Sequence, residues 1–190
     1  MTYFLDFDRT LFDTNAFTRS LISNPACADF RDDIEAAVTT DRGESTAGGT
    51  GRYKLWESLA ALCQHGSLTF APGELAEFVF PDVPVFLKHH GNQSVIVTYG
   101  ATAFLKAKIE SALAGPLMER VIYTHDREKG IALKGLLQDF PKPYVLVDDL
   151  ATQLDSVAEH CPEVSLYEIR RDGKEGSGHY PVIHSFAELP

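Results

Sequence analysis

The chain has few cysteines, few basic residues and no long hydrophobic run. Its 190 residues include three cysteines, Cys27, Cys63 and Cys161, which are far apart and form no CxxC pair. Scattered cysteines argue against a disulfide framework and a cysteine zinc site, so we expect a reducing, cytoplasmic location. No apolar stretch approaches the roughly 20 residues of a membrane helix. The first ten residues do not resemble a secretion signal, and no membrane partner is expected.

Acidic residues outnumber basic ones. Lys and Arg total 17 against 27 Asp and Glu, and the formal net charge is −10. This balance disfavours nucleic acid as a partner, because phosphate backbones bind basic surfaces. The seven histidines show no metal-ligand spacing such as HExxH. The length fits one domain, or one core with a small inserted lobe, and such a core folds without disulfides or metals.

Five short runs rich in β-branched and aromatic residues are predicted to be strands, at residues 3–5, 94–97, 120–123, 144–147 and 164–169. Apolar residues recur with helical spacing between the later runs, at residues 101–114, 127–140 and 150–161. Strands that alternate with helices indicate βαβ units. The expected fold is therefore α/β, a Rossmann-like three-layer core with a mainly parallel sheet.

The interval between the first two predicted strands is too long for a single crossover helix. It contains helical patterns at residues 29–38, 53–63 and 72–78, and a Gly/Ser/Thr-rich loop at 40–51. We therefore expect a small α-helical cap at residues 14–80, inserted into a core formed by residues 1–13 and 81–190. Residues 170–180 are polar and rich in glycine, and a loop is expected there.

Acidic and hydroxyl side chains follow three of the predicted strands. Asp6 and Asp8 follow the first, Thr98 ends the second, and Asp148 and Asp149 end the fourth. Because the carboxyl ends of parallel strands meet at one edge of a sheet, we expect these side chains to converge on one site. Gathered carboxylates repel one another, and all-oxygen ligands suit Mg²⁺, so a magnesium ion is the expected cofactor. Either acid pair could instead cap a turn or a helix.

An anionic substrate at this edge would also need a cationic side chain. Lys129, at the start of the helix before the fourth predicted strand, is the best placed. Lys134 and Arg127 are nearby alternatives. Lys129 could also be a solvated residue on the helix surface.

Four segments of the chain together resemble the motifs of the haloacid dehalogenase-like (HAD) superfamily. DFDRT at residues 6–10 resembles the DxDxT of the first motif, and VIVTYG at 95–100 resembles the strand ending in Thr of the second. EKG at 128–130 resembles the helix-opening Lys of the third, and VLVDD at 145–149 resembles the paired acids of the fourth. Arg9 stands where many members have Gly. An insertion directly after the first motif is similar to the C1-type helical cap of this superfamily.

The resemblance implies a phosphatase of small phosphate monoesters that depends on Mg²⁺ and works through an aspartyl-phosphate. Asp6 would be the nucleophile, and Asp8 the general acid and then the general base. Thr98 and Lys129 would be further catalytic residues that stabilise the transferring group. The presence of Asp8 favours phosphoryl chemistry, since a dehalogenase has no leaving alkoxide to protonate.

The resemblance also implies which residues bind substrate and metal. Thr98, Tyr99 and Gly100 would contact the substrate. Apart from the resemblance, Arg52 of the predicted cap could face the substrate, whereas Trp56 fits helical core spacing better and is expected to pack. The implied metal ligands are Asp6, Asp8, Asp148 and Asp149. The expected partner is a small phosphorylated metabolite, and the protein is expected to be a monomer or a weak oligomer. A phosphotransferase or phosphomutase would share the four motifs, and a non-catalytic binding or regulatory protein with the HAD fold is a third interpretation.

Overall fold

Six strands form one sheet in the computed structural model, which describes residues 1–39, 50–113, 120–124 and 128–189. The strand order is β3-β2-β1-β4-β5-β6, and every neighbouring pair is parallel. This confirms the expected α/β fold with a Rossmann-like parallel sheet. The strands are β1 (Thr2–Leu5), β2 (Ser94–Tyr99), β3 (Val121–Thr124), β4 (Tyr144–Asp148), β5 (Val164–Ile169) and β6 (Val182–Ile183).

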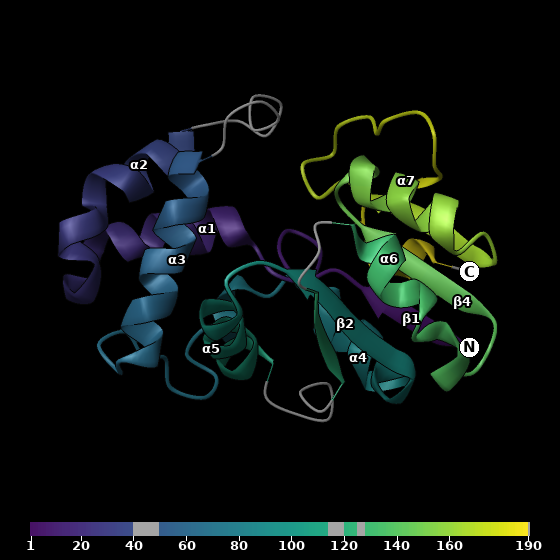
Figure 1. Ribbon diagram of the computed structural model, residues 1–190, viewed down its shortest axis with the longest axis horizontal. Coiled ribbons are helices and arrows are strands. Elements are labelled where there is room, and N and C mark those ends of the chain that lie inside the picture. The colour runs from purple at the N-terminus through teal and green to yellow at the C-terminus, as the bar shows by residue number, and fades with distance from the viewer. Residues whose placement is uncertain (40–49, 114–119, 125–127, 190) are drawn as a thin grey trace.

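Helices cover both faces of the sheet, because successive strand side chains point to opposite sides. Tyr3 and Leu5 belong to one buried cluster, whereas Phe4 between them belongs to another. The first cluster includes side chains of α4 and α5, and the second includes side chains of α6 and α7 (Figure 1). The arrangement is the expected three-layer core. These helices are α4 (Val83–His90), α5 (Thr102–Ala112), α6 (Lys129–Lys134) and α7 (Ala151–His160).

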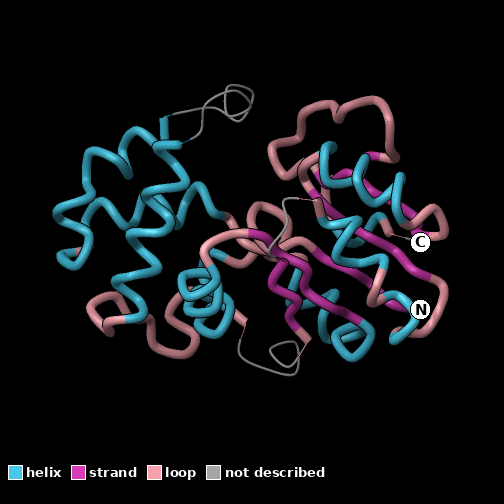
Figure 2. Tube along the Cα trace, in the orientation of Figure 1, coloured by secondary structure: helices cyan, strands magenta, loops and turns pink. Residues whose placement is uncertain are grey.

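A group of helices lies beside the sheet, at the left of Figure 2. It contains α1 (Thr14–Ser20), α2 (Arg31–Thr39) and α3 (Thr50–Gln64), with 3-10 turns at Leu21–Ser23, Pro25–Phe30 and Ala76–Phe78. The chain leaves and returns through paired segments, since Asp13 N–H donates to the Phe78 carbonyl at 2.7 Å and Phe80 N–H donates to the Leu11 carbonyl at 3.0 Å. We call these helices the helical part; the cap boundaries at residues 14 and 80 stay a prediction.

Several local predictions differ from the structure. Residues 72–78 hold only the 3-10 turn Ala76–Phe78, and the helix expected at 127–140 ends at Lys134, before Gly135. Three elements had no clear pattern: α1, α4 and β6. The last has two residues, too few to show a period, and α4 has Pro84 in its first turn. Most of the glycine-rich segment at 40–51 lies outside the described residues. None of the described helices has the length and hydropathy that a membrane span needs.

Arg171 fixes the loop that follows β1. Its Nε and Nη2 donate to the Thr10 carbonyl at 3.1 and 2.9 Å, and its Nη1 contacts both carboxylate oxygens of Asp82 at 2.9 Å. The guanidinium also lies 4.4 Å from the centroid of the Phe80 ring. Asp82 in turn accepts a hydrogen bond from Phe186 N–H at 2.7 Å. The segment after β5 therefore holds the loop that carries the first two site acids.

Helices α6 and α7 approach each other so closely that only glycine fits at their contact. A Cβ atom on Gly130 would lie 2.1 Å from the backbone carbonyl oxygen of Ser156. The Gly130 N–H also donates to Ser156 Oγ at 3.1 Å. This contact sets how deeply the neighbouring residue, Lys129, reaches toward the sheet.

We expect Gly130→Ala to lower the free energy of unfolding by about 1–3 kcal/mol, because the added methyl group forces two helix backbones apart. Denaturant unfolding measures this difference. Gly135→Ala is the matched control, since a Cβ at Gly135 meets nothing within 4 Å. Equal stability of the two variants would contradict the close approach of α6 to α7.

Candidate active site

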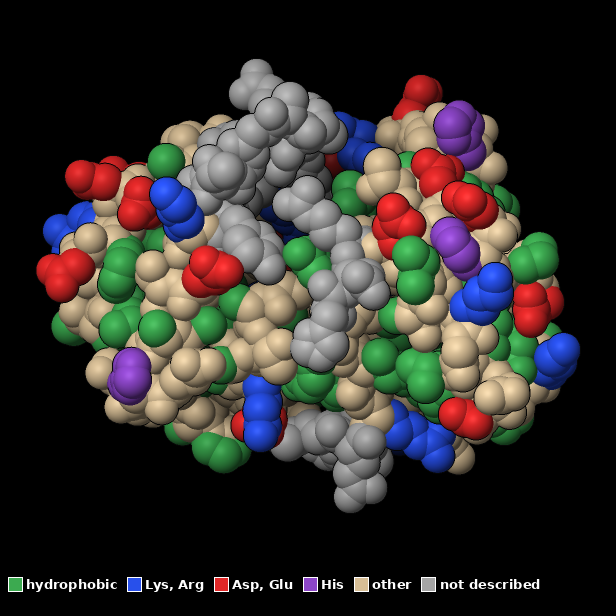
Figure 3. All heavy atoms as spheres, viewed as in Figure 1, with side chains coloured by type: hydrophobic (Ala, Val, Ile, Leu, Met, Phe, Trp, Pro, Cys, Tyr) green, Lys and Arg blue, Asp and Glu red, His purple; other side chains and the backbone are tan. Residues whose placement is uncertain are grey.

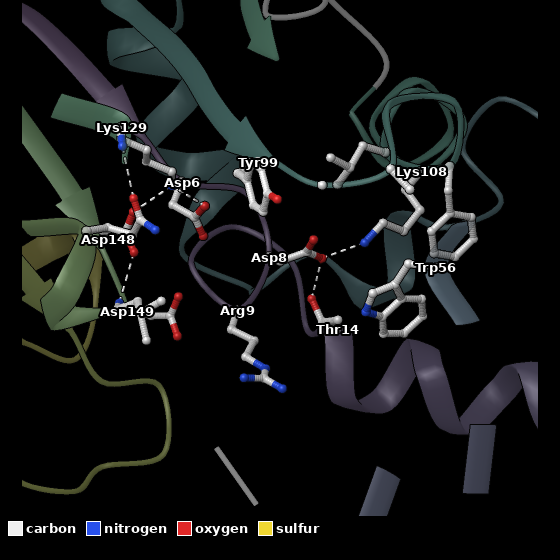
Figure 4. Close-up of a pocket in the computed structure, with 16 residues that line it drawn as sticks. Asp6, Asp8, Arg9, Thr14, Trp56, Tyr99, Lys108, Lys129, Asp148 and Asp149 are labelled. Carbon is white, nitrogen blue, oxygen red and sulfur yellow. Dashed lines mark hydrogen bonds and ion pairs between the residues drawn. The ribbon is translucent and has the colours of Figure 1, made fainter. Parts of the chain in front are cut away.

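A cleft of about 330 Å³ opens at the carboxyl ends of β1, β2 and β4. Residues of both the sheet and the helical part line it. Figure 3 shows the side chains of these two parts, in the orientation of Figure 1. The lining of the cleft includes the acids and cations drawn in Figure 4. The full lining is Asp6, Asp8, Arg9, Thr14, Trp56, Tyr99, Gly100, Ala101, Phe104, Leu105, Lys108, Lys129, Asp148, Asp149, Leu150 and Gln153.

Lys129 joins two acids that the sheet places side by side. Leu5 pairs with Val147 in the β1–β4 ladder, so the next residues, Asp6 and Asp148, are neighbours. The Lys129 Nζ lies 2.6 Å from Asp6 Oδ1 and 2.6 Å from Asp148 Oδ2. Lys129 is only 2% exposed, so the interpretation as a solvated surface lysine is wrong.

The other two candidate cations do not take this place. Lys134 is exposed at the far end of α6, and Arg127 lies outside the described residues. The backbone N–H of Lys129 donates to Gln153 Oε1 at 3.1 Å, which ties the first residue of α6 to α7.

The pKa values of Asp6 and Lys129 are both raised in this cluster, but for different reasons. Burial is the main cause that raises the pKa of Asp6 to about 7; the charge of Asp148 acts in the same direction and Lys129 against it. Burial alone would lower the pKa of Lys129, but the charges of Asp148 and Asp6 outweigh it and raise this pKa. The cluster therefore keeps its ammonium group charged, while ionisation of Asp6 costs free energy when no cation other than Lys129 is near.

Replacing Asp6 by Asn should change how the stability of the metal-free protein depends on pH. The folded-state pKa of Asp6 is raised from 3.8 to about 7, so its contribution to stability is present at low pH and is lost as the pH rises through this window. Asp6→Asn lacks this loss, and its Tm relative to wild type should therefore rise between pH 4 and pH 8. Thermal unfolding at several pH values in chelator measures the difference. A pH-independent difference would show that Asp6 ionises in the folded chain as it does in the unfolded one.

Three acids in the cleft can hold a divalent cation. Asp6, Asp148 and Asp149 each offer a carboxylate oxygen, and these oxygens all lie within 4.8 Å of one another. Both oxygens of Asp148 have partners, since Oδ2 contacts Lys129 and Oδ1 accepts from Leu150 N–H at 2.9 Å. Asp6 and Asp149 are therefore better suited to bind the cation directly, and Asp148 is better suited to a place behind these ligands, without direct contact to the cation. The bond from Leu150 lies in the turn before α7, and the N-cap of that helix is Leu150 itself, with no side-chain cap bond, so Asp148 does not cap the helix. Its site role stays a prediction.

Asp8 lies on the other side of the cleft and faces away from Asp6 (Figure 4). Its Oδ1 accepts hydrogen bonds from Thr14 Oγ1 at 2.5 Å and from Lys108 Nζ at 2.5 Å. Burial alone would raise the pKa of Asp8, but the charge of Lys108 and the two hydrogen bonds outweigh it and hold the pKa below its usual value. Asp6 and Asp8, two residues apart, are thus held by different lysines, and their pKa values are shifted in opposite directions.

Lys108 is the site residue that the sequence analysis missed. It is 2% exposed, on α5, and its ammonium group lies between 5.2 and 5.8 Å from the centroids of four phenylalanine rings. One signal was available. Lys108 follows Phe104 by four residues and Leu105 by three, so it lies on the apolar face of the predicted helix, where a lysine is out of place.

The predicted substrate contacts have different positions. Tyr99 and Gly100 line the cleft, and Gly100 has a φ of +151°, which favours glycine. Thr98 is buried at the end of β2 and is not among the lining residues. The backbone of Arg52 belongs to α3, but its side chain lies outside the described part of the structure. The contacts of Thr98 and Arg52 with a substrate stay predictions.

Two further residues line the cleft. Arg9 has a left-handed φ of +65°, unusual for a residue with a side chain, and its N–H donates to the Phe12 carbonyl at 2.7 Å. Trp56 of α3 stacks on Phe104, with ring centroids 5.7 Å apart. The sequence favours a packing role for Trp56, and the structure shows that it packs and also lines the cleft.

No protein-family model matches the chain, and no curated protein matches it. Solved structures do. A haloacid dehalogenase-like hydrolase from Burkholderia xenovorans is 20% identical and superposes with a TM-score of 0.67 over 100% of this chain and 98% of that chain. YfnB from Bacillus subtilis, a HAD-hydrolase whose structure is bound to magnesium, is 15% identical with a TM-score of 0.59, over 98% and 95% of the two chains.

CbbY from Rhodobacter sphaeroides, in complex with xylulose-(1,5)bisphosphate, is 17% identical with a TM-score of 0.56, over 99% of this chain and 95% of that one. At these identities the likeness concerns the fold. The chain therefore has the fold of the haloacid dehalogenase-like hydrolases, and the recognition made from the sequence is confirmed at that level. The phosphatase branch and the cap type stay predictions.

Proposed function

We propose that this protein is a HAD-like phosphatase that hydrolyses small phosphate monoesters through an aspartyl-phosphate. One observation carries the proposal: Asp6 and Asp8 line the same cleft from opposite sides, and each is anchored through its Oδ1 by a buried lysine. A nucleophile and a general acid on either side of a phosphoryl group need this arrangement, since attack and departure are roughly in line.

In the first step, the Oδ2 of Asp6 attacks phosphorus, since Lys129 holds Oδ1. Asp8, which must first take up a proton because Lys108 and Thr14 hold its pKa low, gives that proton to the leaving oxygen, and the alcohol departs. Asp8, now a carboxylate, then accepts a proton from the water that attacks the aspartyl-phosphate, which releases phosphate and restores both residues. One difficult displacement becomes two easier ones, and the proton on Asp8 is returned at the end of the cycle.

Lys129 opposes the negative charge at the centre of the cleft. It contacts Asp6 and Asp148 and is charged over the whole physiological range, because its pKa is raised. A buried cation at a fixed place stabilises charge that develops on the transferring group without having to reorganise. Thr98, Tyr99 and Gly100, at the end of β2, are proposed to contact the phosphoryl oxygens, and Arg52 the rest of the substrate.

Asp6 and Asp149, with Asp148 behind them and the backbone carbonyl of Asp8, are proposed to hold Mg²⁺. When bound, this ion supplies positive charge to the phosphoryl oxygens and to the ionised nucleophile. The all-oxygen donor set suits this ion. The magnesium in YfnB and the sugar bisphosphate in CbbY, both on this fold, support the proposed metal and substrate class. A cytoplasmic, monomeric or weakly associating protein stays a prediction from the sequence.

Asp6→Asn should reduce hydrolysis of p-nitrophenyl phosphate by at least about 10³-fold, because the amide cannot form the aspartyl-phosphate. Chelation of Mg²⁺ in the wild-type protein should abolish the activity, and added Mg²⁺ should restore it. Release of nitrophenol measures both effects. Asp29→Asn, which changes an exposed acid outside the cleft, is the control and should keep full activity. Activity that ignores both the metal and Asp6→Asn would contradict the proposed function.

The same assay separates hydrolysis from phosphoryl transfer. A phosphatase releases one phosphate for each nitrophenol, with or without an added sugar or alcohol. A phosphotransferase or phosphomutase, which would share the motifs, would release less phosphate than nitrophenol when an acceptor is present. A non-catalytic protein would release neither.

A further inference from the structure

We propose that Lys108 is a positioning residue that fixes Asp8 where the leaving oxygen of the substrate arrives. This inference rests on the proposed function and assigns a role to a residue outside the four sequence motifs. Its basis is the geometry of three groups: the ammonium group of Lys108, the carboxylate of Asp8, and the ring of phenylalanines around them.

Asp8 lies on the side of the cleft from which the leaving group would depart. In an in-line displacement the leaving oxygen lies on the far side of phosphorus from the attacking oxygen. Figure 4 shows the carboxylates of Asp6 and Asp8 on either side of the cleft, with that of Asp8 directed toward Lys108. A phosphoryl group that faces Asp6 thus has its leaving oxygen on the Asp8 side.

The two donors to Asp8 bind the same oxygen. Lys108 Nζ and Thr14 Oγ1 both contact Oδ1, at 2.5 Å. This leaves Oδ2 as the oxygen that exchanges a proton with the leaving group. Because one oxygen is anchored, the direction of the other is set by the position of the ammonium group.

The ammonium group itself has little freedom to move. Its surrounding rings come from the loop after β1, from α1 and from α5, and all are almost fully buried; they are those of Phe7, Phe12, Phe17 and Phe104. Their faces attract a cation, so the charge is stabilised where water is excluded. Among the described residues, Asp8 is the hydrogen-bond acceptor that Lys108 contacts. A cation confined in this way transmits its fixed position to the carboxylate.

A positioning role for a general acid has a kinetic signature that a structural role lacks. Protonation matters most for a poor leaving group and little for a good one. We therefore measure kcat/KM of Lys108→Met, relative to wild type, on phenyl, p-nitrophenyl and 2,4-dinitrophenyl phosphate, which are all aryl phosphates but differ greatly in the acidity of the leaving phenol. The ratio kcat/KM reports the steps up to departure of the phenol, so slow hydrolysis of the aspartyl-phosphate does not affect it.

The expected loss is about 10- to 100-fold with phenyl phosphate and less than about threefold with 2,4-dinitrophenyl phosphate. In an Asp8→Asn background, Lys108→Met should cause no further loss, because the lysine acts through that carboxylate. Lys106→Met is the matched control: Lys106 lies on the same helix, is 61% exposed and pairs with Glu110 at 3.8 Å, so kcat/KM should not change.

Three results would overturn the proposal: an equal loss on all three esters, no loss on any, or a full additional loss in the Asp8→Asn background. Circular dichroism monitors folding. If Lys108→Met does not fold, Lys108→Gln is measured in the same way; its shorter, uncharged side chain keeps a donor but cannot hold Asp8 Oδ1 in the same place, so the loss should be smaller but again largest with phenyl phosphate. If the wild-type protein shows no hydrolysis that depends on Asp6, the proposed function itself fails, and the role of Lys108 with it. Hydrolysis that depends on Asp6, combined with an equal loss on all esters, overturns the role of Lys108 alone.

Discussion

The parallel pairing of β1 with β4 is the constraint on which the site depends. It brings two acids that are far apart in sequence, Asp6 and Asp148, to neighbouring places at one edge of the sheet. Both are buried, so their charges are compatible with the fold only if a cation lies between them. Lys129 provides it at 2.6 Å from each. Helix α6, and the glycine that lets it approach α7, therefore serve to place one ammonium group.

Asp8, on the other side of the cleft, is also held by a buried lysine, but its hydrogen-bond donors come from different parts of the fold. The Asp6 anchor is built from the sheet and its covering helices alone. The Asp8 anchor takes one donor from α5, beside the sheet, and one from Thr14, at the start of the helical part. A movement of the helical part would therefore alter the surroundings of Asp8 and leave Lys129 and its acids in place.

The sequence predicted the features that follow from local pattern. Five strands lay where short β-branched runs were found, and the acids at their ends met because parallel strands point the same way. Lys129 was recognised because it opens a helix beside those acids. Lys108 was missed because helix surfaces carry most lysines, and its buried position depends on phenylalanines from three separate segments that no local window contains. The cleft wall that Trp56 forms was missed for the same reason, since it depends on how α3 packs on α5.

The contact between Arg171 and Thr10 has a consequence for the order in which the molecule is completed. It joins residues 161 positions apart, and the first of them belongs to the turn that carries Asp8. During synthesis the amino-terminal segment leaves the ribosome first. The turn therefore lacks its contact with Arg171 until nearly the whole polypeptide has emerged. A nascent chain that stalls before Arg171 carries every proposed acid of the site without the contact that holds the Asp8 turn in place.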